Sequence, residues 1–184
     1  MAALKYDNFQ YYTYQDYKEW EGRWELIDGV AYSMSPAPYP KHQRVVGYIW
    51  RELEKNLECK NKNCEVYIAP VDWKISDNTT VQPDVSIFCE DTEKQFFSKT
   101  PPLVVEVLSK STAFKDVTTK LKLYEKEGVE FYIIIEPNSE ISDIFKLVDG
   151  EYKLMKKATK DDIYEFELGS DCRTSVDFST IFGR

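Results

Sequence analysis

The chain has 184 residues and a formal net charge of −8, from 24 basic and 32 acidic side chains. A hydrophobic content of 42% with 15% aromatic residues is typical of a globular protein and excludes a largely disordered one. The length suffices for one sizeable core, so we expect residues 1–184 to form a single domain. The acidic balance argues against broad non-specific binding to nucleic acid through surface charge alone.

The apolar runs and the cysteines predict the compartment. No run approaches the roughly 18 apolar residues of a membrane span, and the start of the chain lacks the apolar core of a signal peptide. Cys59 and Cys64 could be half of a zinc-binding set, but the sequence has no second closely spaced cysteine pair or histidine to complete it. Cys89 and Cys172 each stand alone in the sequence. We therefore expect ordinary reduced thiols in a soluble, cytoplasmic protein.

The first half of the chain predicts a hairpin followed by a helix. Residues 13–16 can cap a short helix that reaches about residue 20. Strands at 24–27 and 30–34 flank the turn residues Asp28 and Gly29. Three prolines make residues 35–40 an extended loop, and apolar side chains at helical spacing then predict a helix over 41–57.

The second half predicts strands around one further helix. The helix is expected over about 116–127 and ends at Gly128. Strands are expected at 64–69, 71–75, 85–88, 103–108 and 131–135, followed by a hairpin of 141–148 with 152–156 and a helical turn within 177–182. The order of strand, helix and strand predicts a right-handed parallel crossover, and the whole a mixed α/β fold with helices on a central sheet.

Two acids and a lysine are the most informative residues. Asp84 and Glu106 interrupt apolar, strand-like segments, where an ionised carboxylate is costly unless a positive charge meets it. A divalent cation with oxygen ligands meets that need, and Mg²⁺ is the ion that suits two carboxylates with a phosphate. Lys120, in the following helix, is placed to stabilise charge on an attacked phosphate or to orient the attacking water.

Several stretches together resemble the Uma-two family of restriction-endonuclease-like proteins, within the PD-(D/E)XK nuclease superfamily. Any single stretch is weak, but the ordered set is specific and extends from about residue 12 to 182. The stretches are residues 14–17, 24–29, 34–38, 42–43, 82–86, 104–109, Lys120 with Tyr124, and 128–132.

The resemblance implies a restriction-endonuclease-like core with Mg²⁺-dependent cleavage of phosphodiester bonds. It implies Asp84 and Glu106 as metal ligands and Lys120 as the catalytic lysine. The chain departs from the superfamily pattern because the lysine normally stands two residues after the second acid, and Leu108 occupies that position. The family's common Tyr-Trp dipeptide is replaced by Phe131-Tyr132, which we interpret as variation in the core.

Two further residues are candidates for the site. Glu25 either extends the metal site or receives the charge of the catalytic lysine, and the alternative is an ordinary cross-strand pair with Arg23 or a lysine. His42, the only histidine, either contacts a phosphate or the attacking water, or caps the helix that it begins. Lysines 110, 115, 120 and 122 either form a phosphate-binding rim or a solvated face.

The sequence therefore predicts an Mg²⁺-dependent DNA endonuclease, with Mn²⁺ as a substitute. Its catalytic residues are expected to be Asp84, Glu106, Lys120, Glu25 and His42. Two rival interpretations stay open: a non-catalytic binding protein on a nuclease fold, and a nuclease subunit that needs a separate DNA-recognition partner. Cutting both strands of a duplex would favour a homodimer, and no membrane partner is expected.

Overall fold

A computed structural model describes residues 10–34, 39–90, 95–109 and 113–183. The predicted loop at residues 35–38, Lys110 and the two residues before the second helix lie outside these ranges. Within them, no helix is long and apolar enough to cross a membrane.

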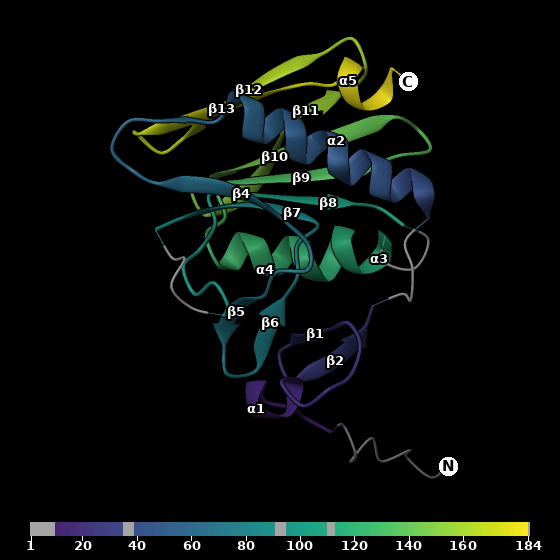
Figure 1. Cartoon of the computed structure of the whole chain (residues 1–184), viewed down its shortest axis with the longest axis vertical. Helices are drawn as coiled ribbons and strands as arrows, with labels where there is room; N and C mark the ends of the chain where they lie inside the picture. The colour runs from purple at the N-terminus through teal and green to yellow at the C-terminus, as the bar shows by residue number, and fades with distance from the viewer. Residues whose placement is uncertain (1–9, 35–38, 91–94, 110–112, 184) are drawn as a thin grey trace.

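A six-stranded sheet forms the centre of the molecule (Figure 1). Its order is β11-β10-β9-β8-β7-β4, and its strands are β4 (Cys64–Ile68), β7 (Val85–Cys89), β8 (Leu103–Val107), β9 (Phe131–Glu136), β10 (Ile141–Val148) and β11 (Glu151–Ala158). Strands β8 and β9 are parallel and the other neighbours are antiparallel. The predicted crossover between parallel strands is therefore correct, and its helix lies between β8 and β9 in the chain.

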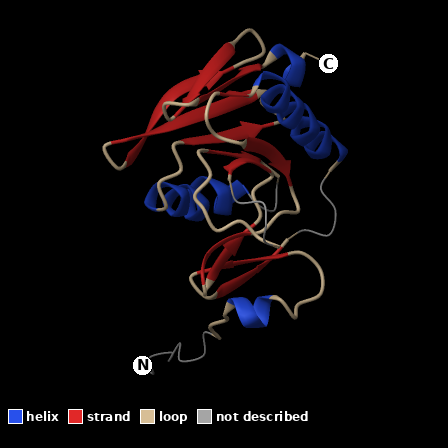
Figure 2. Cartoon of the chain, turned by 60° about the vertical axis from the view of Figure 1, so that its left-hand side comes forward, coloured by secondary structure: helices blue, strands red, loops and turns tan. Residues whose placement is uncertain are grey.

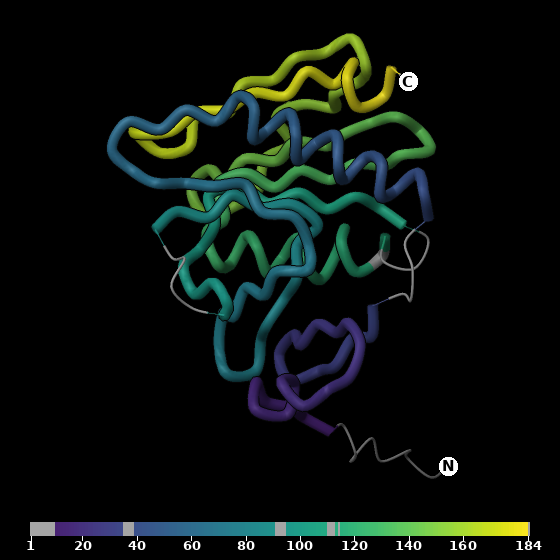
Figure 3. Tube along the Cα trace, in the orientation of Figure 1, coloured from purple at the N-terminus to yellow at the C-terminus, as the bar shows by residue number. Residues whose placement is uncertain are grey.

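Two smaller sheets flank the central one. The first has the order β2-β1-β6-β5, with β1 (Trp24–Ile27), β2 (Val30–Ser33), β5 (Trp73–Ser76) and β6 (Thr79–Val81). The second has the order β12-β13-β3, with β3 (Glu58–Cys59), β12 (Ile163–Leu168) and β13 (Cys172–Asp177). The purple and yellow ends of the tube in Figure 3 place the N-terminal hairpin and the C-terminal strands at opposite ends of the molecule.

Helices separate these sheets. The long helix α2 (Pro40–Asn56) lies on one face of the central sheet, and α3 (Ala113–Lys115), the π-helical turn η1 (Asp116–Lys120) and α4 (Leu121–Lys126) lie on the other (Figures 1 and 2). Two short helices complete the fold, α1 (Tyr14–Tyr17) and α5 (Ser179–Phe182). Strand β8 is buried along its whole length, as its continuous apolar run predicts.

The two faces of β8 serve different cores. Leu103, Val105 and Val107 pack with α2 in one hydrophobic cluster, which also includes apolar residues of β12, β13 and α5. Val104 packs in a second cluster with Tyr124 of α4. Because side chains alternate along a strand, Glu106 lies on the same face as Val104, toward α4. The acid is therefore placed in the layer that holds the second helix.

Both predicted hairpin turns are present. Asp28 and Gly29 have φ angles of 49° and 78°, and Asp149 and Gly150 have φ angles of 55° and 83°. Two successive positive φ angles are the geometry of the tight turns that Asp-Gly favours. Strands β3, β6, β12 and β13 lie outside the predicted elements.

The prediction of four free thiols is wrong. Cys59 is bonded to Cys172, and Cys64 is bonded to Cys89. In each pair the two residues face each other across antiparallel strands, β3 with β13 and β4 with β7. Sequence spacing could not indicate this pairing because strand pairing brings together residues that are remote along the chain.

The central strand β9 should carry much of the stability. Ile133 is fully buried, whereas Ile163 on β12 is 67% exposed. Ile133→Ala should lower the free energy of unfolding by about 2–5 kcal/mol, because it removes buried methyl groups and leaves a cavity. Ile163→Ala, the matched control, should change it by at most about 0.5 kcal/mol. Denaturant titration measures both, and equal effects would contradict the described core.

Candidate active site

Asp84 and Glu106 meet on neighbouring strands. Val85 faces Val105 in the antiparallel pair of β7 and β8, so the next facing positions are 84 and 106. Residues that face each other directly in an antiparallel pair share a face of the sheet. The backbone N–H of Val107 donates to Asp84 Oδ2 at 2.9 Å, which holds the carboxylate beside β8. The charge of Asp84 acts on Glu106, so the two carboxyl groups belong to one polar cluster.

Lys120 reaches these acids from the helix that follows β8. Its Nζ lies 2.7 Å from Glu106 Oε1, and its side chain is only 1% exposed. The residue ends the π-helical turn η1, a helical irregularity that is frequent at functional sites. A lysine on the helix thus reaches the acid on β8. At the superfamily's usual position, Leu108 packs instead against the hydrophobic cluster of this layer.

Glu25 completes the enclosure of Lys120 from the opposite side. It belongs to β1 of the flanking four-stranded sheet and is fully buried. Its Oε1 lies 2.7 Å from Lys120 Nζ and accepts a hydrogen bond from the backbone of Gln82 at 3.0 Å. Its Oε2 pairs with Lys115. Glu25 therefore pairs with lysines and not with Arg23, which donates to Gln82; both the catalytic and the ordinary ion-pair interpretation of Glu25 include a lysine partner.

His42 joins the site through Asp84. It lies in the first turn of α2, and its Nε2 is 3.3 Å from Asp84 Oδ2. Burial lowers the pKa of His42, but the hydrogen bond and negative charge of Asp84 outweigh this effect and raise the pKa above its usual value. The imidazole and Asp84 are 11% and 15% exposed, which makes them the more accessible side of the cluster.

Three further side chains that were not among the predicted catalytic residues belong to this cluster. Asp116 Oδ1 is 3.8 Å from Lys120 Nζ, and the hydroxyl of Tyr124 donates to Glu106 Oε1 at 2.8 Å. Lys115 was expected on a rim but is paired with Glu25, whereas Lys122 of that predicted rim is exposed. The spacing of Asp116, Lys120 and Tyr124 by four residues places them on one helix face and is the signal that could have found them.

The cluster carries more negative than positive charge. Among the described residues, four carboxyl groups surround two ammonium groups, which leaves two negative charges when all six are ionised and the imidazole is neutral. The carboxyl groups belong to Glu25, Asp84, Glu106 and Asp116, and the ammonium groups to Lys115 and Lys120. Such an excess in a buried place must be met by protons or by a cation.

The pKa shifts indicate which groups of the cluster are charged and which are protonated. Burial raises the pKa of Glu106 well above the usual carboxyl value; Lys120 opposes this effect, and the charges of Asp116 and Asp84 add to it. Burial also acts to raise the pKa of Glu25, but Lys120 and Lys115 outweigh it and the pKa is lowered. Burial lowers the pKa of Lys120, yet Glu106 and Glu25 raise it well above its ordinary value. Lys120 is therefore held as an ammonium and Glu25 as a carboxylate, whereas Glu106 favours its proton.

The donor set fits Mg²⁺ and Mn²⁺. Both ions prefer oxygen ligands, and Asp84 and Glu106 offer carboxylate oxygens from facing strand positions. A divalent cation would offset the excess of carboxyl over ammonium groups, and its presence would favour the ionised form of Glu106. The residues of the cluster are thus chemically suited to one such ion.

Comparison with known proteins identifies the family and the fold of the chain. The family model described as "Uma2: Putative restriction endonuclease" matches residues 10–169. An uncharacterized protein of Synechocystis sp. is 30% identical over 159 residues, which are 80% of this chain and 80% of that protein. The crystal structure of a "putative nuclease belonging to DUF820" from Anabaena variabilis superposes with a TM-score of 0.71 at 16% identity, over 93% of this chain and 97% of that one. That likeness shows a common fold, and the chain belongs to the Uma2 family of restriction-endonuclease-like proteins.

Proposed function

We propose that this protein is an Mg²⁺-dependent endonuclease that hydrolyses phosphodiester bonds in DNA. The observation that carries the proposal is the buried cluster in which carboxyl groups outnumber ammonium groups, beside a lysine held as an ammonium. Asp84 and Glu106 would hold the metal ion. When bound, the ion supplies Lewis-acid stabilisation of charge on the phosphate and lowers the pKa of a coordinated water.

Lys120 would act through its positive charge. Its raised pKa keeps it protonated at neutral pH, so it is a poor general base. Its ammonium lies beside Glu106 and is placed to stabilise charge that develops on the scissile phosphate. Glu25 orients this ammonium from the opposite side and Tyr124 orients the Glu106 carboxylate. Both are positioning residues.

His42 would act at the more open edge of the cluster. Its raised pKa increases the protonated fraction of the imidazole near neutral pH. Asp84 orients the ring through Nε2. A protonated imidazole in this place would contact a phosphate oxygen as a cation, which complements the role of Lys120.

The charge and the size of the chain bear on its partners. A net charge of −8 gives no general attraction to DNA, so a separate DNA-recognition partner would assist substrate binding. Cleavage of both strands of a duplex would require a second active site, which a homodimer supplies.

The burial of the cluster favours one rival function. Glu25, Glu106 and Lys120 are each at most 3% exposed, as structural core residues would be. On this alternative the protein binds a partner without cleaving DNA, and the ion pairs only hold the sheets together. The cleavage assay below separates the two functions.

Plasmid cleavage tests the proposal directly. Supercoiled DNA should be nicked or linearised with Mg²⁺ or Mn²⁺, and a chelator should stop the reaction. Glu106→Gln should lower the rate by about 100-fold or more, because it removes a charge that the metal ion requires. Glu151→Gln, at an exposed position on β11, is the control and should cut normally. Metal-independent cutting, or full activity of the Glu106 variant, would contradict the assignment.

Lys120→Met tests the role of the lysine separately. We expect a loss of cleavage of about 100-fold or more with metal affinity retained or increased, because the variant removes a positive charge beside the carboxylates. Lys122→Met, on the exposed side of the same helix, should behave as the parent. Calorimetry with Mn²⁺ measures affinity, and circular dichroism checks the fold. A Lys120 variant that folds and cuts at the parent rate would remove Lys120 from the mechanism.

The pH dependence of stability tests the carboxyl cluster without an activity assay. Glu106 has a raised pKa in the folded protein, so the fold favours its proton. As pH rises from the ordinary carboxyl pKa toward that raised value, the metal-free parent should lose stability relative to Glu106→Gln. Mg²⁺ needs the ionised carboxylate, so the rise in melting temperature that it produces should increase over the same window.

The Asp84→Asn, Glu106→Gln double variant is the control for that measurement. It should show no rise in melting temperature with Mg²⁺ or Mn²⁺ at any pH, because both proposed ligands have lost their charge. An Mg²⁺ effect that is independent of pH in the parent, or one that persists in the double variant, would place the ion elsewhere.

A further inference from the structure

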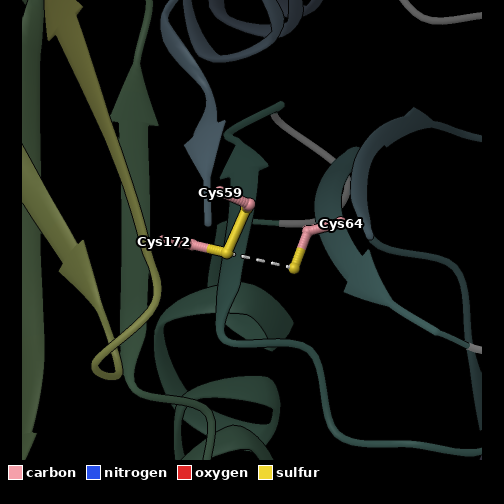
Figure 4. A group of neighbouring side chains, drawn as sticks. All are labelled: Cys59, Cys64 and Cys172. Atoms are coloured by element: carbon pink, nitrogen blue, oxygen red, sulfur yellow. Dashed lines mark hydrogen bonds between the residues drawn. A yellow bond between two sulfur atoms is a disulfide. The ribbon is translucent and has the colours of Figure 1, made fainter. Parts of the chain in front are cut away.

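Three of the four cysteines, Cys59, Cys64 and Cys172, converge on one point of the fold (Figure 4). Cys59 and Cys64 lie on β3 and β4, Cys89 on β7 and Cys172 on β13. Cys64 Sγ is 3.4 Å from Cys172 Sγ, although these two atoms belong to different disulfides. The sulfur atoms of Cys59, Cys64 and Cys172 all lie within 4.8 Å of one another, and Cys89 is bonded to Cys64. Three sulfurs from the two disulfides are thus in close contact, and the fourth, that of Cys89, is attached to one of them.

The positions of the disulfides do not require this convergence. Each one joins two strands that are already hydrogen-bonded neighbours, β3 with β13 in the three-stranded sheet and β4 with β7 in the central sheet. Between the two disulfides, the contact is the non-bonded approach of Cys64 to Cys172. Two disulfides at separate places would link the same pairs of strands equally well. A tetrahedral metal ion, in contrast, needs its sulfur ligands close together.

We propose that these four cysteines, when reduced, bind one Zn²⁺ ion as a structural tetrathiolate site. Zinc takes four thiolates at about 2.3 Å in tetrahedral geometry, which sets the sulfur atoms about 3.8 Å apart. Four residues separate Cys59 from Cys64, a spacing within the range of zinc-binding pairs. The fold supplies the second pair, Cys89 and Cys172, that the sequence order conceals.

The surroundings allow both reduction and metal entry. Cys172 is 5% exposed and the other three cysteines are half-buried. One cavity reaches Cys59 and Cys172 beside Lys60, and another reaches Cys89 and Cys172 beside Lys62. These cavities give a reductant and an ion access to the sulfurs.

Two chemical steps would convert the disulfide form of the four cysteines into the zinc-bound form. Reduction of both disulfides takes up four electrons and four protons, supplied by two molecules of a dithiol that each close to a cyclic disulfide. Zn²⁺ then displaces one proton from each thiol, so four protons are released for each ion bound. The bound ion would join β3 and β13 to β4 and β7 directly, which the two disulfides do not.

Metal analysis of the reduced protein tests the site. The whole chain is reduced with a dithiol, freed of it without oxygen, and given Zn²⁺ or Co²⁺. We expect one ion per chain by elemental analysis, and for Co²⁺ the visible spectrum of a tetrahedral ion with thiolate charge-transfer absorption. The oxidised protein should bind neither ion at this cluster. A reduced parent without a stoichiometric ion, or Co²⁺ without thiolate absorption, would overturn the proposal.

Two double variants separate zinc binding from simple disulfide formation. Cys59→Ser with Cys172→Ser, and Cys64→Ser with Cys89→Ser, each leave one facing pair intact. Both variants should lose the stoichiometric ion, and retention by either one would contradict a four-sulfur site. If a variant fails to fold by circular dichroism, the Co²⁺ spectrum of the parent decides. Glu106→Gln should keep the zinc ion, which makes this test independent of the nuclease proposal.

Discussion

The ion pairs of Lys120 hold the layers of this protein together. The ammonium lies between Glu106 of the central sheet and Glu25 of the flanking four-stranded sheet, at 2.7 Å from an oxygen of each. The helix that carries Lys120 is the layer between those sheets. Every other group of the candidate site contacts one of these three residues or is bound to Asp84 beside them. The position of this single nitrogen therefore fixes the geometry of the site.

Such an arrangement is a costly way to build a core. Desolvation of a buried ion pair can exceed its attraction, and well-packed apolar residues of similar volume are often as stable or more stable. Removing only one partner typically costs about 3–5 kcal/mol because a buried charge is left alone. This chain nevertheless places four carboxyl groups around two lysines in one region. Perturbed and charged clusters of this kind are more typical of active sites than of structural cores.

The central sheet is linked to each flanking sheet by a polar or sulfur cluster. Lys120 and Glu25 connect it to the four-stranded sheet, and the approach of Cys64 to Cys172 connects it to the three-stranded sheet. The two clusters differ in chemistry, since one offers hard oxygen atoms and the other soft sulfur atoms. The oxygen cluster would therefore suit Mg²⁺ and the sulfur cluster would suit Zn²⁺.

Local patterns predicted the elements better than the contacts between them. Asp28-Gly29 and Asp149-Gly150 are tight turns, and the apolar periodicity of residues 41–57 agrees with α2, because turn chemistry and burial act over a few residues. Strand β12 was missed although its burial alternates, since short half-exposed strands give a weak signal. Asp84 and Glu106 were singled out because a carboxylate in an apolar strand is visible in sequence, whereas Lys120 was assigned from the family resemblance. The pairing of the cysteines depends on strand register, and the lysine partners of Glu25 depend on the packing of a helix against β1; no local pattern determines either.

The position of the lysine on a helix has a consequence beyond its distance from Glu106. A lysine two residues after Glu106 on β8 would share its face of the sheet but would bring no other polar residue with it. On the helix, Lys120 is accompanied by Asp116 and Tyr124 at successive turns, and both reach the acids of β8 or the ammonium itself. Tyr132 of β9 donates to the backbone of Asp116 at 3.0 Å and ties the irregular turn to the central sheet. The helix thus supplies the charge together with the groups that orient it, and Leu108 is left to pack in the core.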